Sequence, residues 1–323
     1  MQQRELGALG PTSILTLGGG GLGQLWGETT REECVACVHE AVEAGINLLD
    51  MAPGYGNGEA ERVIGEAFGG SMPQGVRITT KCRVGQTPPA EVPGLLRETL
   101  AGSLERMKLS SVDVFFLHSN IVPDNDPMSD TPDGPVRLTP LSVYREQVRP
   151  TFEALKAEGL IRHWGITGIG HPDTIMEVLA GEEPTPAIVQ CIANALDSAG
   201  SLAYTPGPRK PRDIAALAQA YGVGVMGIRA VQAGALTDQI DRPLPPDHGE
   251  VRDYNRAEGF RALAKEMGVS AADLGHRYAL SMPNVDTVVL GIKNRTELRA
   301  CLAMADAGPL STEEMAKVDA SFG

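Results

Sequence analysis

Short apolar runs alternate with amphipathic stretches along most of the chain. The runs contain few polar positions, which is typical of parallel strands buried on both faces. Between them, apolar residues recur at helical spacing. We therefore expect strands at 14–18, 46–50, 76–81, 112–118, 163–167, 187–191, 223–228 and 285–290.

The stretches between these runs predict helices. Gly159 suits the left-handed position after a helix, and Pro172 suits a first helical turn. The expected helices are 30–44, 59–68, 95–107, 143–158, a helix from 172, 212–221, 252–267, 271–280 and 296–305. About eight strand–helix units in 323 residues favour one closed (β/α)8 TIM barrel domain spanning 1–323. A doubly wound open sheet is the alternative.

Three polar segments rich in Pro, Gly or Asp interrupt this rhythm, at 119–139, 198–211 and 232–250. Long loops in compact domains are usually functional or disordered. All three follow predicted strands, and in a barrel the loops that follow strands lie at the catalytic C-terminal face. We expect them to be long substrate loops that form the wall of a pocket.

Charge and composition exclude some classes of partner. A net charge of −13 with a pI near 5.0 argues against nucleic acid and anionic membrane, which both need a basic surface. MQQRELGALG has no targeting pattern, and no run is long and apolar enough to span a membrane. Five scattered cysteines read as reduced thiols in a cytoplasmic protein. Cys34 and Cys37 fall within a helical pattern, so we expect helix packing there and no metal site.

The glycine run Gly18–Gly23 formally satisfies G-x-G-x-x-G. A dinucleotide-binding fold is the less favoured interpretation, because QLWGETT does not begin a smooth helix and no acidic residue fits the ribose role at a strand end roughly 20 positions later. We expect instead a flexible first barrel loop that lets a flat ligand approach the backbone.

Four polar residues end or directly follow apolar runs: Asp50, Tyr55, Lys81 and His118. Alone, each has an ordinary explanation: a salt bridge at the barrel rim, a tyrosine in a turn or a histidine in the core. If the runs are parallel strands, however, the four groups gather at one end of one sheet. A phenol, an ammonium, a carboxylate and an imidazole together there predict a proton-transfer site.

This combination suits carbonyl chemistry. A tyrosine with a pKa near 10 is a poor acid or base at neutral pH, and a nearby ammonium lowers that pKa. A carboxylate fixes the ammonium, and an imidazole donates a hydrogen bond to a carbonyl oxygen that gains negative charge. The site would protonate an alkoxide as it forms from a carbonyl, or catalyse the reverse. Nothing in the set supplies a hydride, so a nicotinamide cofactor is implied.

At these residues the chain resembles an aldo-keto reductase over nearly its whole length. The resemblance rests on DMAPGYGNGEAERVIG (50–65), TK (80–81), SLERMKLSSVDVFFLH (103–118), WGITG (164–168), VQ (189–190), RAVQAGALT (229–237) and GIKNRTEL (291–298). It implies a catalytic tetrad of Asp50, Tyr55, Lys81 and His118, in which Tyr55 is the general acid/base. Trp26, Tyr55 and His118 are the residues expected to contact the substrate.

The resemblance also implies a cofactor site that favours NADP(H) over NAD(H). Four departures from the family's usual residues stand out. Thr167-Gly168 replaces Ser-Asn, Ile228 replaces an aromatic residue that often stacks on the nicotinamide, Glu297 replaces Gln or Arg, and Cys301 replaces Asn. The implied contacts are Asp50, Thr167, Gly168 and Gln190 for the carboxamide end, Ile228 for the ring, Arg229, Ala230, Val231 and Gly234 for the pyrophosphate, and Gly291, Lys293, Asn294 and Glu297 for the adenosine phosphate.

The expected function is hydride transfer between a nicotinamide cofactor and an aldehyde, ketone or sugar hemiacetal. The polar mouth loops favour a small polar carbonyl or sugar over a steroid. Two other classes stay open. One is an aldo-keto reductase-like subunit that senses cofactor and serves a partner. Turnover of a generic aldehyde would distinguish an enzyme from such a subunit. The other is a barrel lyase or isomerase with Lys81 as a Schiff base, which borohydride trapping would detect. Barrels host many chemistries, so fold alone does not decide.

Overall fold

A closed ring of parallel strands forms the centre of the molecule. The computed structural model describes residues 1–126, 137–181 and 183–322. The ring consists of β3 (Leu15–Gly18), β4 (Leu48–Asp50), β5 (Arg77–Cys82), β6 (Val112–Val122), β8 (Ile161–Thr167), β9 (Ile188–Ile192), β10 (Gly224–Ile228) and β11 (Thr287–Leu290). Each strand pairs with the next, and β11 pairs with β3, so the ring has no open edge. This confirms the predicted (β/α)8 barrel and excludes the open sheet.

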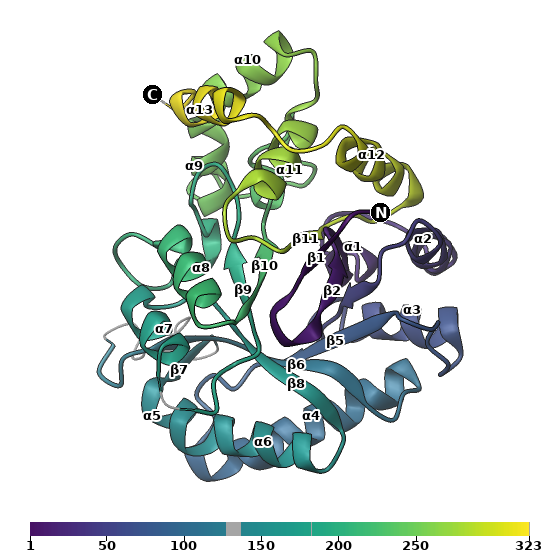
Figure 1. Cartoon of the computed structure of the whole chain (residues 1–323), viewed down its shortest axis with the longest axis vertical. Coiled ribbons are helices and arrows are strands. Elements are labelled where there is room, and N and C mark those ends of the chain that lie inside the picture. The colour runs from purple at the N-terminus through teal and green to yellow at the C-terminus, as the bar shows by residue number, and fades with distance from the viewer. Residues whose placement is uncertain (127–136, 182, 323) are drawn as a thin grey trace.

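Helices surround the ring (Figure 1). They are α1 (Gly19–Leu22), α2 (Arg31–Glu43), α3 (Glu59–Phe68), α4 (Val92–Met107), α5 (Leu141–Val143), α6 (Arg149–Ala157), α7 (Pro172–Leu179), α8 (Pro211–Ala220), α9 (Gly249–Arg256), α10 (Glu258–Glu266), α11 (Ala271–Ser281), α12 (Arg295–Asp306) and α13 (Thr312–Ala320). Side-chain caps fix several starts: Thr30 accepts from the Glu33 N–H, and Asn294 accepts from the Glu297 N–H. No helix in the described part of the chain is long and apolar enough to cross a lipid bilayer.

Two predicted helices differ from the structure. The expected helix at 252–267 is two helices, α9 and α10, because Ala257 has a non-helical ψ of 19°. The expected helix at 143–158 includes a π-helical segment, Tyr144–Val148, before α6 begins. In the predicted loop 119–139, β6 continues to Val122 and a short strand, β7 (Leu138–Pro140), pairs with β6. Residues 127–136 of that loop lie outside the described residues.

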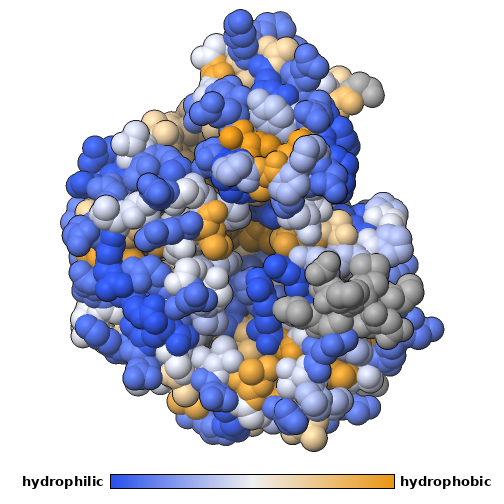
Figure 2. Space-filling model, turned by 180° about the vertical axis from the view of Figure 1, so that it is seen from behind, coloured by the Kyte–Doolittle hydropathy of each residue, from blue (hydrophilic) through white to orange (hydrophobic). Residues whose placement is uncertain are grey.

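A hairpin that the sequence pattern did not predict closes the N-terminal end of the barrel. It consists of β1 (Gln3–Glu5) and β2 (Pro11–Ser13), paired antiparallel, and it lies across the ring in Figure 1. Leu6, between the two strands, is fully buried. It packs in one cluster with Leu48, Val114, Phe116, Ile188 and Met226. Figure 2 shows the opposite face, which is hollowed near its centre. The barrel is therefore open toward the carboxyl ends of its strands.

The glycine run is a buried helical turn, α1, so the expected flexible loop is wrong. A Cβ at Gly18 would lie 2.3 Å from the Leu290 carbonyl oxygen. A Cβ at Gly21 would lie 1.8 Å from the Ile292 carbonyl oxygen, and one at Gly23 would lie 2.5 Å from the Tyr55 carbonyl carbon. These glycines let one segment of backbone approach another, because they have no side chain to exclude it. They seat α1 against the end of β11 and against the turn that holds Tyr55.

Gly21→Ala should lower the free energy of unfolding by about 1–3 kcal/mol, the usual cost of forcing an extra methyl group into a packed interior. The added Cβ meets backbone atoms that have no room to move away. Thermal or denaturant unfolding followed by circular dichroism measures the change. Gly94→Ala is the matched control, because no atom lies within 4 Å of the added Cβ and the position is helical. Equal stability of the two variants would contradict the packing role of α1.

Candidate active site

The four residues predicted to form a proton-transfer site lie together at the open end of the barrel. Asp50 ends β4, Lys81 lies in β5, His118 lies in β6, and Tyr55 lies in the turn after β4. The Lys81 Nζ donates to Asp50 Oδ2 at 2.8 Å and to the Met51 carbonyl oxygen at 2.7 Å. The same Nζ lies 5.0 Å from the centroid of the Tyr55 ring. That ring meets the His118 ring edge to face, with centroids 5.9 Å apart.

The Asp50 carboxylate is buried, with 2% of its surface exposed, and both of its oxygens are engaged. Oδ2 accepts from Lys81, while Oδ1 accepts from the Thr79 hydroxyl at 2.6 Å and from the Gln190 side-chain amide at 2.9 Å. Its charge is therefore balanced inside the protein, as a buried carboxylate requires. Tyr55 and His118, by contrast, are half-buried and reach the mouth of the barrel.

Lys81 carries a stable positive charge. Burial acts to lower the pKa of Lys81, but Asp50 and Tyr55 together outweigh it, so the net shift is upward. A Schiff-base lysine needs a neutral amine, and its pKa is normally depressed. The pairing with Asp50 therefore argues against the barrel lyase or isomerase.

Burial, rather than the ammonium, controls the pKa of Tyr55. The sequence suggested that Lys81 would lower this pKa below its usual value. Lys81 does act in that direction, but burial of the phenol is the larger effect and the net shift is upward. Tyr55 is thus protonated at neutral pH. The pKa of His118 lies well below its usual value, first because the imidazole is buried and then because Lys81, Arg83 and Arg137 are positively charged. The imidazole is therefore neutral.

Of the residues predicted at the carboxamide end, Thr167 ends β8, Gly168 follows it, and Gln190 lies in the middle of β9 beside Asp50. The Thr167 hydroxyl donates to the Leu117 carbonyl oxygen at 3.0 Å, and the Gly168 N–H donates to the Gln190 carbonyl oxygen at 2.8 Å. The Gln190 side-chain nitrogen donates to Asp50. No donor among the described residues reaches the Gln190 side-chain oxygen, which is therefore oriented as an acceptor for an amide N–H.

The predicted pyrophosphate loop has an unusual backbone. Arg229 has a φ of 61°, Gln232 of 48° and Ala233 of 50°, a region that residues other than glycine seldom occupy, and Gly234 follows with 95°. Ile228, just before the loop, packs with Ile169, Ile192 and Ala199. Ala230 is buried and Val231 is half-buried. Strained backbone of this kind clusters at ligand sites, where the fold holds it in place.

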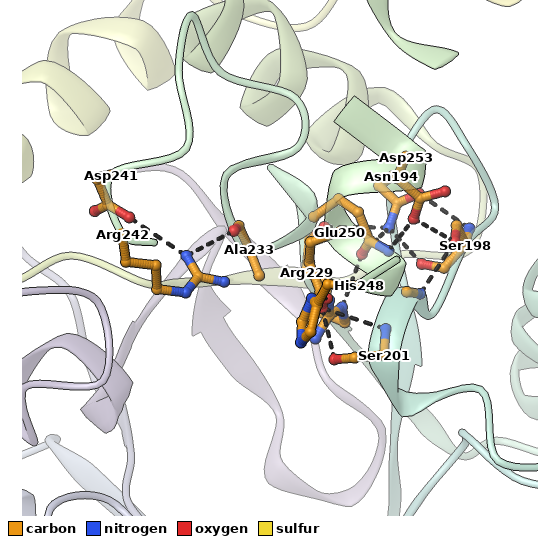
Figure 3. Close-up of polar contacts among 12 residues, drawn as sticks. Asn194, Ser198, Ser201, Arg229, Ala233, Asp241, Arg242, His248, Glu250 and Asp253 are labelled. Carbon is orange, nitrogen blue, oxygen red and sulfur yellow. Dashed lines mark hydrogen bonds and ion pairs between the residues drawn. The ribbon is translucent and has the colours of Figure 1, made fainter. Parts of the chain in front are cut away.

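Helix α9 holds the Arg229 side chain, as Figure 3 shows. The guanidinium forms an ion pair with Glu250, and its Nε donates to Gln232 Oε1 at 2.7 Å. Gln232 in turn donates to Asp253 Oδ2 at 2.7 Å. Burial lowers the pKa of Arg229 while Glu250 opposes that shift. The roles of Glu250 and Asp253 could not be predicted from the sequence, because both residues come from a helix whose contact with this loop no local pattern encodes.

At the adenosine-phosphate segment, Glu297 faces Lys293. The Lys293 Nζ lies 2.5 Å from Glu297 Oε1 and 3.5 Å from Asp241 Oδ2. The Lys293 N–H donates to Glu297 Oε2 at 3.0 Å. Asn294 caps α12 by accepting from the Glu297 N–H at 2.9 Å. The charge of Lys293 is therefore already shared between two carboxylates.

Trp26, predicted to contact the substrate, lies at the adenosine-phosphate side. Its Nε1 would be 3.2 Å from a Cβ at Gly291 and 2.7 Å from one at Gly20. The Arg242 guanidinium lies over its ring, 5.1 Å from the centroid. Arg242 also donates to the Ala233 carbonyl oxygen at 3.0 Å (Figure 3). The predicted loop at 232–250 thus crosses to the first loop of the barrel and connects the two halves of the predicted cofactor site.

A cavity of about 340 Å³ reaches the tetrad from the side of α4. Lys81 and His118 line it together with Arg83, and Glu98 and Arg106 of α4 face it as well. Arg83 was not among the residues predicted from the sequence. Its position two residues after Lys81 is the available signal, because residues i and i+2 of a strand point to the same side.

This chain is similar to known proteins along nearly its whole length. The family model described as Aldo/keto reductase family matches residues 14–322. L-galactose dehydrogenase of Arabidopsis thaliana is 26% identical over 332 residues, which cover 99% of this chain and 95% of that protein. A probable voltage-gated potassium channel subunit beta of Oryza sativa subsp. japonica is 26% identical over 311 residues, with 88% and 85% covered. An aldo-keto reductase from Klebsiella pneumoniae, solved in complex with NADPH, shares the fold with a TM-score of 0.70 and 19% identity, covering 99% of this chain and 95% of that one.

Proposed function

The chain belongs to the aldo/keto reductase family, and from that premise we propose that it is a nicotinamide-dependent oxidoreductase. It transfers a hydride between the cofactor and an aldehyde, ketone or sugar hemiacetal. The observation that carries this proposal is the buried Asp50–Lys81 pair, which lies directly beside the half-buried Tyr55 and His118. We propose further that the barrel is one domain and acts in the cytoplasm on a small molecule.

In this proposal each residue of the tetrad has one task. The cofactor, when bound, supplies or accepts the hydride. Tyr55, protonated at neutral pH, donates its proton to the carbonyl oxygen. The neutral His118 imidazole donates an N–H hydrogen bond to the same oxygen and orients it. Lys81 stabilises the tyrosinate that remains, and Asp50 holds the Lys81 ammonium in place.

The arrangement of the predicted cofactor residues fits a nicotinamide dinucleotide. The Gln190 side-chain oxygen would accept from the carboxamide, since Asp50 holds its nitrogen. The Gln232 and Gly234 N–H groups donate within the loop, so other backbone N–H groups of 229–234 would receive the pyrophosphate. Successive N–H groups in left-handed turns form anion-binding concavities. Lys293 and Asn294 would meet the adenosine ribose. A relative of the same fold was solved with NADPH.

A small polar carbonyl or a sugar is the proposed substrate. The segments after β9 and β10 are polar and rich in Pro and Gly, and one relative is named as an L-galactose dehydrogenase. A panel of short aldehydes, ketones and aldoses, each run with NADPH and with NADH, tests this proposal through the absorbance of the reduced nicotinamide. Tight cofactor binding with no turnover of any member would favour the cofactor-sensing subunit instead. The relative named as a potassium channel subunit makes that outcome worth measuring.

We propose NADP(H) as the preferred cofactor, with a modest margin over NAD(H). The Lys293 ammonium favours a 2′-phosphate, but Glu297 lies 2.5 Å from that ammonium and repels the same phosphate. Glu297→Gln should therefore tighten NADPH binding by about fivefold, since one exposed charge pair is worth up to about 1 kcal/mol. NADH, which lacks the phosphate, should change little.

Fluorescence titration of both cofactors measures this difference. Glu313→Gln is the matched control, because Glu313 and Lys317 form another pair on one helix turn, at 2.8 Å on α13. It should alter neither affinity. An equal change for both cofactors in Glu297→Gln, or a loss for NADPH, would remove Glu297 from the phosphate site.

A further inference from the structure

Arg83 places a positive charge beside the catalytic groups. It follows β5 and lines the cavity that reaches Lys81 and His118. No carboxylate in the described ranges 1–126, 137–181 and 183–322 lies within ion-pair distance of it. Although Arg83 stays accessible to solvent, burial and then the charge of Arg137 lower its pKa. The environment of this guanidinium therefore disfavours its positive charge.

Arg137 adds a second guanidinium at the same mouth. It directly precedes β7, and its side chain lies over the ring of Tyr204, 5.4 Å from the centroid. Tyr204 belongs to the polar segment after β9, so Arg137 is held between two of the mouth loops. Among the described side chains, no carboxylate forms an ion pair with Arg137 either.

Both guanidiniums act on His118. The charges that lower the pKa of this imidazole are those of Lys81, Arg83 and Arg137, and among the described residues no carboxylate opposes them. Asp50 neutralises Lys81, so Arg83 and Arg137 are the two cations acting on His118 for which the described residues offer no ion-pair partner. The chain as a whole has 41 acidic and 28 basic residues, so two guanidiniums beside the catalytic groups stand out in a predominantly acidic protein.

The other charged groups on the cavity are arranged around α4. Arg106 is paired with Glu61 at 2.6 Å and is already neutralised. Glu98 is the one carboxylate on the cavity lining, and it lies within ion-pair distance of no described basic side chain. A ligand that enters this cavity thus meets Arg83 next to the reacting groups and Glu98 on the α4 side.

We propose that the substrate carries an anionic group, a carboxylate or a phosphate, which Arg83 and Arg137 bind while the carbonyl reaches Tyr55 and His118. This inference rests on the proposed oxidoreductase function and narrows its substrate class. A guanidinium binds either anion through two parallel hydrogen bonds. A bound anion also relieves the repulsion between two neighbouring cations, because each then has a partner of opposite charge.

The test compares aldehydes that differ in charge but little in shape. Succinic semialdehyde is paired with its neutral methyl ester, and glyceraldehyde 3-phosphate is paired with glyceraldehyde. For the wild-type protein with saturating cofactor, kcat/KM should be about tenfold or more higher for the anionic member of at least one pair, the gain expected of a charge-assisted hydrogen bond. The pair that shows the preference identifies the anion as carboxylate or phosphate.

Two variants should move this preference in opposite directions. Arg83→Gln should reduce it by about tenfold, mainly through KM for the anionic aldehyde. Glu98→Gln should increase it, because it removes the opposing charge. Arg162→Gln is the matched control: the Arg162 side chain is 75% exposed, pairs with Asp113 at 3.5 Å and lies near the start of strand β8, at the opposite end of the barrel. This control removes the same charge and should leave the ratio of kcat/KM for anionic and neutral aldehydes unchanged.

The outcomes separate this inference from the proposed function. Equal kcat/KM for neutral and anionic aldehydes would overturn the proposal of an anionic substrate but leave the oxidoreductase function standing. The same would follow if the ratio of the two kcat/KM values were unchanged in both Arg83→Gln and Glu98→Gln. Absence of all turnover would overturn the oxidoreductase. Quenching titration of the cofactor-bound protein with succinic semialdehyde and with glyceraldehyde 3-phosphate then decides the anion site: weaker binding of either in Arg83→Gln supports it, and equal binding of both refutes it.

Discussion

Tyr55→Phe is expected to lower the turnover of an aldehyde by about 10²–10⁴-fold, the usual contribution of general acid catalysis. The substitution removes one oxygen and keeps the ring. The edge-to-face contact with His118 is a contact of the ring and is retained, while the interaction of the hydroxyl with the Lys81 ammonium is lost. Packing and cofactor affinity should therefore stay close to wild type.

Steady-state kinetics together with a cofactor titration check this result. Tyr221→Phe is the control, because Tyr221 is 56% exposed and lies at the end of α8, away from the site. His118→Ala should also be impaired, since it removes the second donor to the carbonyl oxygen. If Tyr55→Phe turned over an aldehyde at a near wild-type rate with the cofactor fully bound, the proposed proton donor would be wrong.

Lys81→Met is expected to lower turnover by at least 10²-fold and to shift the pH profile of the remaining activity. Carbonyl reduction needs protonated Tyr55, so this activity falls as the pH rises through the pKa of Tyr55. Lys81 lowers that pKa, and its removal raises it. The alkaline loss of reductase activity should therefore move to higher pH, and the onset of alcohol oxidation should move to higher pH as well.

This variant also leaves Asp50 without its counterion, and an unpaired buried charge costs about 3–5 kcal/mol. Circular dichroism and thermal unfolding establish how much folded protein is present. A smaller amount of folded protein scales the rate but does not move a pH profile, so the profile isolates the role of Lys81. Adding Asp50→Asn removes the unpaired charge and should recover part of the lost stability. If the alkaline limb of the pH–rate profile of Lys81→Met stayed at the wild-type position, the coupling of Lys81 to Tyr55 would be refuted.

The barrel could be predicted because its elements are periodic and local. A continuous apolar run such as 112–118 predicts a strand buried on both faces, and the count of eight such runs predicts closure. The strand ends then place Asp50, Lys81 and His118 on one rim without any knowledge of contacts. The resemblance added the cofactor segments, whose positions in the barrel follow from the same strand order.

The remaining features depend on contacts between segments far apart in the chain. The glycine run serves backbone packing against Ile292, which the run itself does not encode. Trp26 lies against Gly291 and beneath Arg242 because two loops meet there. The upward shift of the Tyr55 pKa depends on how deeply the finished fold buries the phenol. Such effects arise only when the whole structure is assembled.

The pairing of β3 with β11 has a consequence for how the protein is made. The ribosome synthesises β3 near the start of the chain and β11 close to its end, yet Leu15, Leu17 and their neighbours need β11 to complete the ring. Until β11 emerges, β3 and β10 each present an unpaired, apolar edge on which another chain can add. The barrel therefore closes only after most of the chain has left the ribosome, and until then both edges are open to aggregation.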